Sequence, residues 1–394
     1  INNNSIYAIG IDNKKFGNIL ESSGTVNVKK ESGYSYGLRN KSKNTDEING
    51  LKFNIVTNSY GILHYASKDL KIKNIVSSGN GTAIYMGSNN DLSLENNNIN
   101  SSRALVLGEK NGTVNVTSGN YSSTNYTLGI YNNNVKGTIN INGGIIKSTL
   151  TTLYDVDGTF NINGGEIIAS QYGINFDSSA QTGTINMNDG QIVSNGDSVH
   201  GYSATVNFSG GNVIHKSGNG INLSNYSNIT LSNDFSFSKE SVGNGIYLNS
   251  TGNVVVKDNA KITGDVGIEN STNGGATILL KDNAVIESRI GINGRNGGNF
   301  QTIVTMGEKD GNVNTNYPKI ISSEKAITNS SILNIYDGSL TGLKDNSIGV
   351  IVKDSEENYD LLIQDESDTL EKVTIAIPNL EEFGNVAQIG NTYY

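Results

Sequence analysis

Three near-identical phrases stand close together in the chain: Gly137-Thr-Ile-Asn-Ile-Asn-Gly-Gly144, Gly158-Thr-Phe-Asn-Ile-Asn-Gly-Gly165 and Gly183-Thr-Ile-Asn-Met-Asn-Asp-Gly190. A looser copy follows at Thr205-Val-Asn-Phe-Ser-Gly-Gly211. Each phrase alternates polar and apolar residues, which predicts a short strand with one buried face, and it ends in a glycine turn. A phrase that returns at a nearly constant interval is typical of a stacked repeat fold.

The same spacing extends far beyond these phrases. Eleven steps between successive first apolar residues, from Val26 to Ile278, cover 252 residues, or about 23 residues per coil. Later steps lengthen toward Leu333 and Leu361. The predicted column consists of Val26, Leu51, Leu70, Leu92, Val114, Ile139, Phe160, Ile185, Val206, Ile229, Val254, Ile278 and Ile303.

Two further strands are predicted in each coil. Apolar pairs after the glycine turn, such as Ile145-Ile146 and Ile192-Val193, indicate a second strand. A small residue followed by an aliphatic one indicates a third strand, stacked too tightly for a larger side chain. These third-strand pairs are Gly10-Ile11, Gly37-Leu38, Gly61-Ile62, Ala83-Ile84, Ala104-Leu105, Gly129-Ile130, Gly173-Ile174, Gly220-Ile221, Gly245-Ile246, Gly267-Ile268, Gly291-Ile292, Ala326-Ile327 and Gly349-Val350.

Three short strands per coil predict an all-β fold, a single-stranded parallel β-helix (β-solenoid) of about 15 coils of roughly 23 residues each. The repeated phrases and the Gly-Ile column resemble the right-handed β-helix of the pectate-lyase superfamily. They resemble the β-helical passengers of bacterial autotransporters and related surface adhesins more closely. The resemblance covers roughly residues 5–360. The right-handed sense is what this resemblance implies, because periodicity alone does not set it.

The predicted β-helix covers residues 1–352. Residues 353–394 depart from the repeat and are expected to form an acidic C-terminal coil, a cap or a transition segment, with a strand at 372–377 that ends before Pro378. Residues 351–383 hold ten acidic residues against two lysines. The first predicted strand of the chain, Tyr7–Ile11, has the pattern of the third strand of a coil. We therefore expect upstream coils to be missing from this sequence.

Composition excludes several classes of function. The net charge of −9 and the scarcity of arginine speak against a nucleic-acid partner, because phosphate binding needs a basic stripe. The chain has no run of apolar residues long enough to span a membrane. The absence of cysteine excludes disulfides and cysteine-based metal sites, and it is typical of proteins exported unfolded.

Acidic residues provide one candidate site. Asp155 and Asp157, with Glu166 and Asp177 in the next coil, can form a Ca²⁺ site or a carboxylate pair for acid–base chemistry, or they can be solvated turn residues. A pectate lyase also needs an arginine beside its calcium. Arg39, Arg103, Arg289 and Arg295 lie in other coils. The sequence motifs of polygalacturonases are absent, so no catalytic, metal-binding or cofactor-binding residue is predicted.

Histidine and tyrosine give further candidates. The three histidines, His64, His200 and His215, are expected at ordinary surface positions, the alternative being a metal site made by the last two. Tyrosines beside the Gly-Ile column either bind sugars or proteins, because they are rigid and amphipathic, or pack over the corners of the coil. These tyrosines are Tyr60, Tyr85, Tyr131, Tyr172, Tyr202 and Tyr247.

The outward Thr and Asn of the repeated phrases form a Thr-x-Asn array between Thr113 and Asn207. Regular threonine arrays resemble those of ice-binding proteins. The other interpretation is that stacked Asn residues satisfy one another's amide groups along a ladder.

The sequence therefore predicts a non-enzymatic β-helix on the bacterial cell surface, an adhesin passenger or stalk that presents a binding surface to a protein or glycan of host or neighbouring cells. The alternative is a polysaccharide lyase, a hydrolase or a depolymerase like those of phage tailspikes. Less favoured readings are a fibre that self-associates end to end or laterally and an ice-binding solenoid. Extracellular localisation, no cofactor and a role in adhesion and virulence follow from the leading interpretation.

Overall fold

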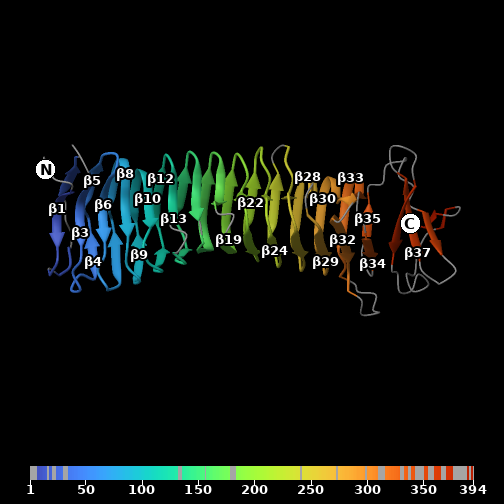
Figure 1. Ribbon diagram of the computed structural model, residues 1–394, viewed down its shortest axis with the longest axis horizontal. Helices are drawn as coiled ribbons and strands as arrows, with labels where there is room; N and C mark the ends of the chain where they lie inside the picture. The colour runs from blue at the N-terminus through green and yellow to red at the C-terminus, as the bar shows by residue number, and fades with distance from the viewer. Residues whose placement is uncertain are drawn as a thin grey trace. The chain divides into compact units, whose positions relative to one another are not determined.

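The computed structural model describes residues 7–341 apart from short gaps, followed by the backbone of five later strands. The gaps lie at residues 16, 20–23, 30–33, 132–134, 156, 178–182, 240–241, 272–273, 298–299, 309–315, 329–331 and 336–338. The chain divides into two compact units, Ile1–Thr205 and Val206–Tyr394. The described residues of both units form strands joined by turns, with no helix among them (Figure 1).

Unit 1 is a parallel β-solenoid whose strands stack in three columns. The first column contains β4 (Glu47–Asn49), β7 (Leu70–Lys73), β9 (Asp91–Glu95), β11 (Thr113–Val116), β14 (Thr138–Ile141) and the first parts of β17 (Thr159–Ala169) and β19 (Gly183–Ser194). The second contains β2 (Thr25–Val28), β5 (Lys52–Ile55), the first parts of β8 (Val76–Met86) and β10 (Asn97–Leu107), β12 (Gly119–Ser123), β15 (Ile145–Ser148) and the later parts of β17 and β19.

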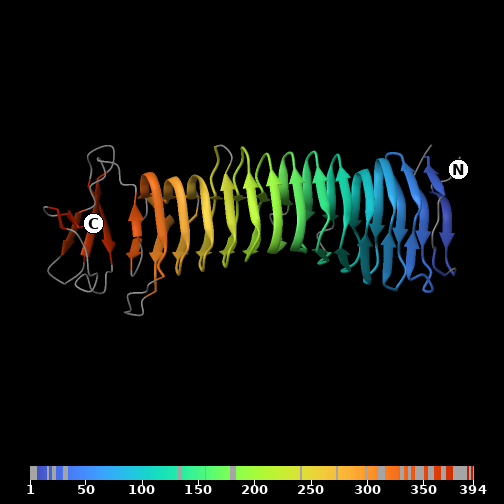
Figure 2. The ribbon, with the colours of Figure 1, turned by 180° about the vertical axis from the view of Figure 1, so that it is seen from behind.

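The third column of unit 1 carries the candidate site described below. It contains β1 (Tyr7–Asn13), β3 (Tyr34–Asn40), β6 (Ser59–His64), the later parts of β8 and β10, β13 (Tyr126–Ile130), β16 (Thr151–Asp155), β18 (Tyr172–Phe176) and β20 (Val199–Gly201). All these pairings are parallel. The neighbouring arrows run side by side in both views of the ribbon (Figures 1 and 2).

Unit 2 repeats the arrangement after β21 (Ala204–Phe208), which spans the boundary. Its first column contains β24 (Ser227–Leu231), β27 (Gly252–Val256), β29 (Ala276–Leu280), β32 (Phe300–Met306) and β34 (Ile332–Ile335). Its second contains β22 (Asn212–His215), β25 (Ser236–Lys239), the first parts of β28 (Lys261–Asn270), β30 (Val285–Asn293) and β33 (Lys319–Thr328), and β35 (Ser339–Thr341). Its third contains β23 (Ile221–Leu223), β26 (Ile246–Leu248) and the later parts of β28, β30 and β33.

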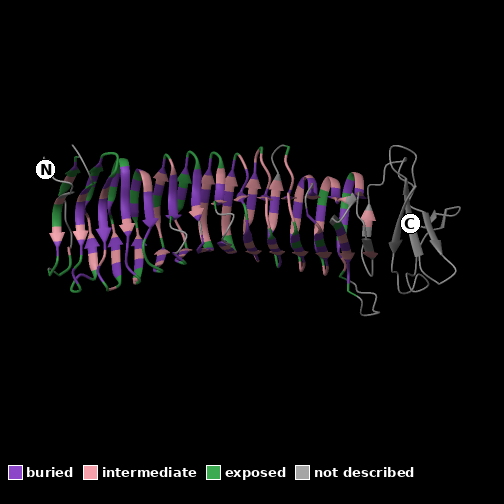
Figure 3. Ribbon diagram, in the orientation of Figure 1, coloured by how far each residue is buried: buried purple, intermediate pink, exposed green. Residues whose placement is uncertain are grey.

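The core lies inside the coils, where equivalent aliphatic residues stack on one another. Ile139, Phe160 and Ile185 pair in register in the first column, and none of them is exposed. Alternation along each strand places buried residues inside and partly exposed residues outside (Figure 3). Burial of apolar surface stabilises the fold by about 25 cal/mol per Å². Each added coil extends the same core and buries more of this surface.

The glycine turn of the repeated phrase has a conformational cause. The last glycine of each copy has a positive φ: 91° at Gly144, 83° at Gly165, 94° at Gly190 and 79° at Gly211. This left-handed region is strained for residues with a Cβ atom, so the phrase ends in glycine at each turn.

The predicted all-β parallel solenoid is confirmed, and its arrangement is consistent with a right-handed β-helix. It has about 11 turns rather than the 15 expected. The predicted first column is wrong at three positions. Val26 pairs with Phe53 in the second column, Leu51 is a buried turn residue before β5, and Val304 rather than Ile303 pairs with Ile278. Alternation alone does not tell one column from another, and a shift of one residue reverses the faces of a strand.

The third column is also corrected. Leu105 pairs with Leu128, so Thr127 and not Gly129 occupies the position of the small residue. Thr152 and Ser198 take the same position in two other coils. The hydroxyl groups of these three residues form hydrogen bonds with nearby protein atoms. Thr127 Oγ1 donates to the Lys147 carbonyl oxygen at 2.6 Å, for example.

Beyond the parallel columns the backbone changes its pairing. β36 (Val350–Lys353), β37 (Tyr359–Gln364) and β38 (Leu370–Ile375) pair antiparallel, as do β39 (Gln388–Ile389) and β40 (Thr392–Tyr393). β31 (Asn296–Gly297) forms a hairpin with β32. The boundary at 352 and the role of 353–394 as a cap stay predictions. The predicted pair Gly349-Val350 lies largely outside the described residues.

Candidate functional site

The predicted acidic cluster does not converge. The carboxylate of Asp155 is fully buried and accepts hydrogen bonds from the backbone nitrogens of Asp157 at 3.0 Å and Gly158 at 2.7 Å. Asp155 therefore closes the turn after β16. Asp157 lies 3.9 Å from Lys136 Nζ, and Asp177 accepts a hydrogen bond from the Tyr154 hydroxyl at 2.8 Å.

Glu166 lies on a different strand, in the second column, where it pairs with Ile145 and Gln191. Among the described residues no group of three or more His, Asp or Glu side chains is placed to hold a metal ion. The four acidic residues thus occupy separate positions, with two of them engaged by the protein's own donors.

His64 is fully buried, contrary to the predicted surface position. It continues a row of stacked polar side chains inside unit 1. Asn13 Nδ2 donates to Asn40 Oδ1 at 3.0 Å, and Asn40 Nδ2 donates to His64 Nδ1 at 3.2 Å. His64 Nε2 faces the Lys68 carbonyl oxygen at 3.3 Å. This pattern requires a neutral imidazole with its proton on Nε2. Burial accordingly lowers the pKa of His64 from 6.5 to about 4.

The other two histidines lie in different environments. His215 is buried in unit 2, with Nδ1 at 2.9 Å from the Gly218 carbonyl oxygen and its ring edge-on to Phe237. His200, in unit 1, stacks on Tyr172 with 4.0 Å between ring centroids and pairs with Asp197 at 2.8 Å. The prediction of a surface position was wrong for His215.

The Thr-x-Asn array is in register in unit 1, and its amides form a ladder. Asn140, Asn161 and Asn186 each donate Nδ2 to Oδ1 of the Asn one coil earlier, at 2.7, 2.8 and 2.7 Å, starting from Asn115. Asn163 and Asn188 extend a second ladder from Asn142. The interpretation of the Asn residues as a self-satisfying ladder is confirmed.

Tyrosines gather on the outer face of the third column of unit 1. Two positions in each coil point outward there: two residues before and one residue after the buried aliphatic residue. The first position is occupied in successive coils by Tyr36, Tyr60, Thr82, Arg103, Tyr126, Thr151 and Tyr172. The second is occupied by Arg39, Leu63, Tyr85, Val106, Gly129, Tyr154, Asn175 and His200. We call the rings at and beside these positions the aromatic face: Tyr34, Tyr36, Tyr60, Tyr65, Tyr85, Tyr126, Tyr131 and Tyr154.

The first half of the aromatic face is a chain of ring contacts. Tyr36 and Tyr60 stack with 5.5 Å between centroids, and Tyr60 meets Tyr85 edge-on at 5.4 Å. Tyr65 lies beside Tyr85 at 6.3 Å. Glu109, in the loop after β10, accepts hydrogen bonds from the hydroxyls of Tyr65 at 2.6 Å and Tyr85 at 3.4 Å.

The second half is a three-ring cluster. Tyr126 stacks on Tyr154 at 5.1 Å and on Tyr131 at 6.3 Å, while Tyr131 also contacts Tyr154 at 6.3 Å. Tyr126 is nearly buried, whereas Tyr131 is 57% exposed. Burial raises the pKa values of Tyr126 and Tyr154 well above the usual range, so both phenols stay protonated, and Tyr154 donates its proton to Asp177.

Arg103 lies between the two halves, on the strand between those of Tyr85 and Tyr126. Its guanidinium carbon lies 5.0 Å from the Tyr126 ring centroid and 6.0 Å from that of Tyr131, which is cation–π geometry. Its buried Nε has no hydrogen-bond partner among the residues that the structure describes. No described carboxylate forms an ion pair with Arg103, in contrast to Arg39, which is paired with Asp12, and Arg289, which is paired with Asp265 and Glu324.

Sequence reasoning found part of this face. Tyr60, Tyr85 and Tyr131 were predicted beside the Gly-Ile column, but Tyr36, Tyr126, Tyr154 and Arg103 were missed. The signal was available in the spacing, since the two outward positions follow from the buried residue of each third strand. Of the other predicted tyrosines, Tyr172 stacks on His200, Tyr202 is exposed, and Tyr247 lies in unit 2.

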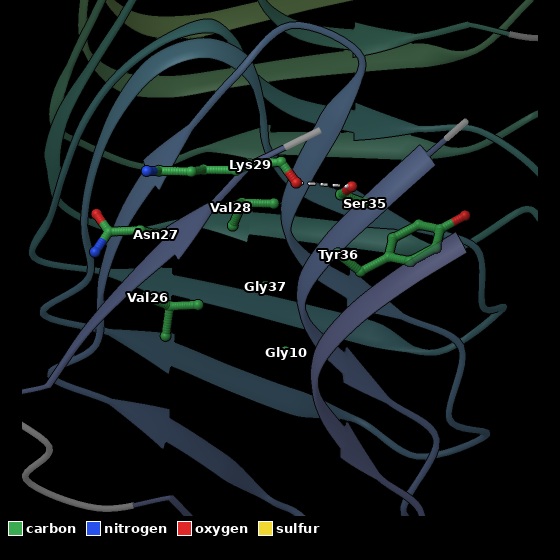
Figure 4. Close-up of a pocket in the computed structure, with 8 residues that line it drawn as sticks. All are labelled: Gly10, Val26, Asn27, Val28, Lys29, Ser35, Tyr36 and Gly37. Carbon is green, nitrogen blue, oxygen red and sulfur yellow. Dashed lines mark hydrogen bonds between the residues drawn. The ribbon is translucent and has the colours of Figure 1, made fainter. Parts of the chain in front are cut away.

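A small hollow near the start of unit 1 adds no chemistry. Gly10, Val26, Asn27, Val28, Lys29, Ser35, Tyr36 and Gly37 line it, and Ser35 Oγ donates to the Lys29 carbonyl oxygen at 3.2 Å (Figure 4). The Tyr36 ring points away from Val26 and Val28 (Figure 4), and it stacks on Tyr60 of the aromatic face. The lining residues include no carboxylate or histidine that can act as an acid or base.

In the part of the chain that the structure describes, no helix is long and apolar enough to cross a lipid bilayer. No protein-family model matches the chain, and neither a curated protein nor a solved structure is significantly similar to it. The fold is therefore defined by its own strand pairing, and its function must be argued from the aromatic face.

Proposed function

We propose that this chain is a non-enzymatic β-helix of the bacterial cell surface, part of an adhesin passenger or stalk, which holds out the aromatic face as a binding surface. The observation that carries the proposal is the pair of tyrosine clusters, one on each side of Arg103, on one column of a regular solenoid. Tyr rings combine a large apolar area with a hydroxyl donor and lose little side-chain entropy on binding.

The likeness of the repeat to autotransporter passengers and the absence of cysteine support a surface location. The state of the carboxylates supports binding rather than catalysis. Asp155 accepts hydrogen bonds from backbone nitrogens and Asp177 accepts one from a tyrosine hydroxyl, so both carboxylates already serve as acceptors within the protein.

Attachment of the fluorescently labelled protein to host epithelial and bacterial cells tests the proposal. Tyr131→Ala removes the most exposed ring of the three-ring cluster and should reduce attachment severalfold. Tyr226→Ala removes a similarly exposed ring, 51% accessible, from unit 2 and should leave attachment unchanged. Equal attachment by the two variants would show that the aromatic face is not the binding surface.

A reducing-sugar assay on uronan and neutral polysaccharides separates this proposal from the lyase, hydrolase and depolymerase alternatives. The wild-type protein should release no reducing ends above the level of a heat-denatured sample. Turnover of any of these polymers contradicts the non-enzymatic proposal.

A further inference from the structure

We infer that the aromatic face binds a glycan chain that carries a single acidic sugar among neutral ones, with the carboxylate on Arg103. The inference rests on the proposed function and specifies the ligand of the same face. Three features of unit 1 support it: the spacing of the rings, the unpaired charge of Arg103 and the carboxylates on either side.

The spacing of the face suits a chain of sugar rings. Parallel strands repeat at about 4.8 Å, and the rings of Tyr36, Tyr60 and Tyr85 follow one another at 5.5 and 5.4 Å. A pyranose ring has nearly the length of one such step and presents an apolar C–H face with hydroxyls at its edge. A linear glycan lying along the third column thus meets aromatic rings in successive coils on both sides of Arg103, whose own coil supplies the guanidinium in place of a ring.

Arg103 supplies the only charge at the centre of this row that lacks an opposite partner among the described residues. A guanidinium binds a carboxylate through two parallel hydrogen bonds, and its two terminal nitrogens can donate both of them. The Nε of Arg103 is enclosed by the protein, whereas the side chain as a whole is only half-buried, so the terminal nitrogens are the donors that a carboxylate from solvent meets, and the ring of Tyr126 holds the guanidinium in place. An arriving carboxylate finds a donor pair that is already oriented and pays little ordering entropy.

Carboxylates flank this central cation. Glu109 lies on the side of Tyr65 and Tyr85, and Asp177 lies on the side of Tyr154, each accepting a tyrosine hydroxyl. A polyanion with a charge on every sugar would place like charges near both of them, which costs binding energy. The charge pattern negative–positive–negative therefore favours an otherwise neutral glycan with a single acidic sugar over a polyuronate or a heavily sulfated glycan.

The test uses three probes with the full chain: a singly sialylated milk pentasaccharide, the same oligosaccharide without sialic acid, and a galacturonic acid pentamer. Binding is followed by tyrosine fluorescence, since the chain has 19 Tyr and no Trp, and by calorimetry. The sialylated probe should bind about tenfold more tightly than the neutral one, a difference of about 1.4 kcal/mol. The galacturonic acid pentamer should bind more weakly than the sialylated probe.

Arg103→Gln should reduce the affinity ratio of the sialylated to the neutral probe to about one, because the neutral probe keeps its contacts with the rings. Arg103→Lys should restore part of the preference. Arg289→Gln is the matched control, since it removes an arginine whose charge is already paired in unit 2. Melting curves identify any variant that fails to fold.

An unchanged preference in Arg103→Gln, or tighter binding of the galacturonic acid pentamer than of the sialylated probe, overturns the inference. If no probe binds while Tyr131→Ala still lowers cell attachment, the inference that the face binds this glycan is refuted and the proposed function stands. If the sialylated probe binds as expected but the protein attaches to no cell, the proposed function fails and the glycan site stands.

Discussion

Replacing His64 with Asn should make unit 1 less sensitive to acid. The imidazole is fully buried and accepts a hydrogen bond from Asn40 on Nδ1, so only its neutral form fits. Its pKa is lowered from 6.5 to about 4 in the folded protein. Between these values the unfolded chain binds one more proton than the folded one, so the free energy of unfolding falls as pH falls from 6.5 to 4.

The size of this fall follows from the pKa difference. Each pH unit between 6.5 and 4 lowers the free energy of unfolding by about 1.4 kcal/mol. The total loss is therefore about 3 kcal/mol below pH 4, and there is no loss above pH 6.5. His64→Asn can continue the amide row from Asn40 but leaves a small cavity, which costs about 1 kcal/mol or more at every pH. The variant should therefore be less stable at pH 7.5 and lose less stability on acidification.

Urea unfolding at pH 7.5 and 4.5, followed by tyrosine fluorescence and circular dichroism, measures the difference. The parent should lose about 2–3 kcal/mol more than the variant between these two pH values. His200→Asn, which leaves the buried row intact, should retain the parent's steep dependence. Parallel pH profiles for parent and His64→Asn would refute the assignment of a buried neutral imidazole.

Three further changes test the packing of the coils. Gly267→Val places a Cβ atom 2.2 Å from Ile286 Cγ2 and 2.5 Å from the Gly291 carbonyl oxygen, so overpacking should lower the free energy of unfolding by about 3 kcal/mol. A Cβ atom at Gly17 meets no close neighbour, so the Gly17→Val variant should melt within a degree or two of the parent. Asp155→Ala leaves backbone donors buried and unpaired, so the free energy of unfolding in urea should fall by about 1–3 kcal/mol, and added Ca²⁺ should not restore it. Stabilisation of the parent protein by Ca²⁺ would instead support a cation site at Asp155. Asn161→Ala removes two ladder hydrogen bonds and should cost about 1–2 kcal/mol, whereas a change below the measurement error would show that the ladder adds nothing to stability.

The fold could be predicted because its physical cause is local and repeated. Alternation in Thr138–Ile141, the positive φ of Gly144 and the tight packing at Gly267 are properties of short segments, and each leaves its mark in the sequence. Column membership is not local. Thr25–Val28 and Thr113–Val116 share the same four letters yet lie in different columns, because their neighbours in adjacent coils decide where each strand pairs.

The candidate site was harder to predict for the same reason. Arg103 appears ordinary in the sequence, and only the stacking of coils places it on the strand between those of Tyr85 and Tyr126, with its guanidinium against the Tyr126 ring. His64 is similar, because its burial depends on Asn40 and Asn13, which precede it by one and two coils respectively. Residues whose environment is made by other coils need the register before they can be interpreted.

The asparagine ladders have an evolutionary consequence. In each, the amide of the later coil donates to the earlier one in the same orientation, as Asn161 does to Asn140 and Asn186 does to Asn161. Removal or duplication of one whole coil joins an identical donor to an identical acceptor, so the gene can gain or lose a coil without creating a mismatched junction. Insertions within a coil break the ladder. Length variation among descendants of this gene should therefore occur in whole coils, so that the length of the solenoid can change while its packing stays the same.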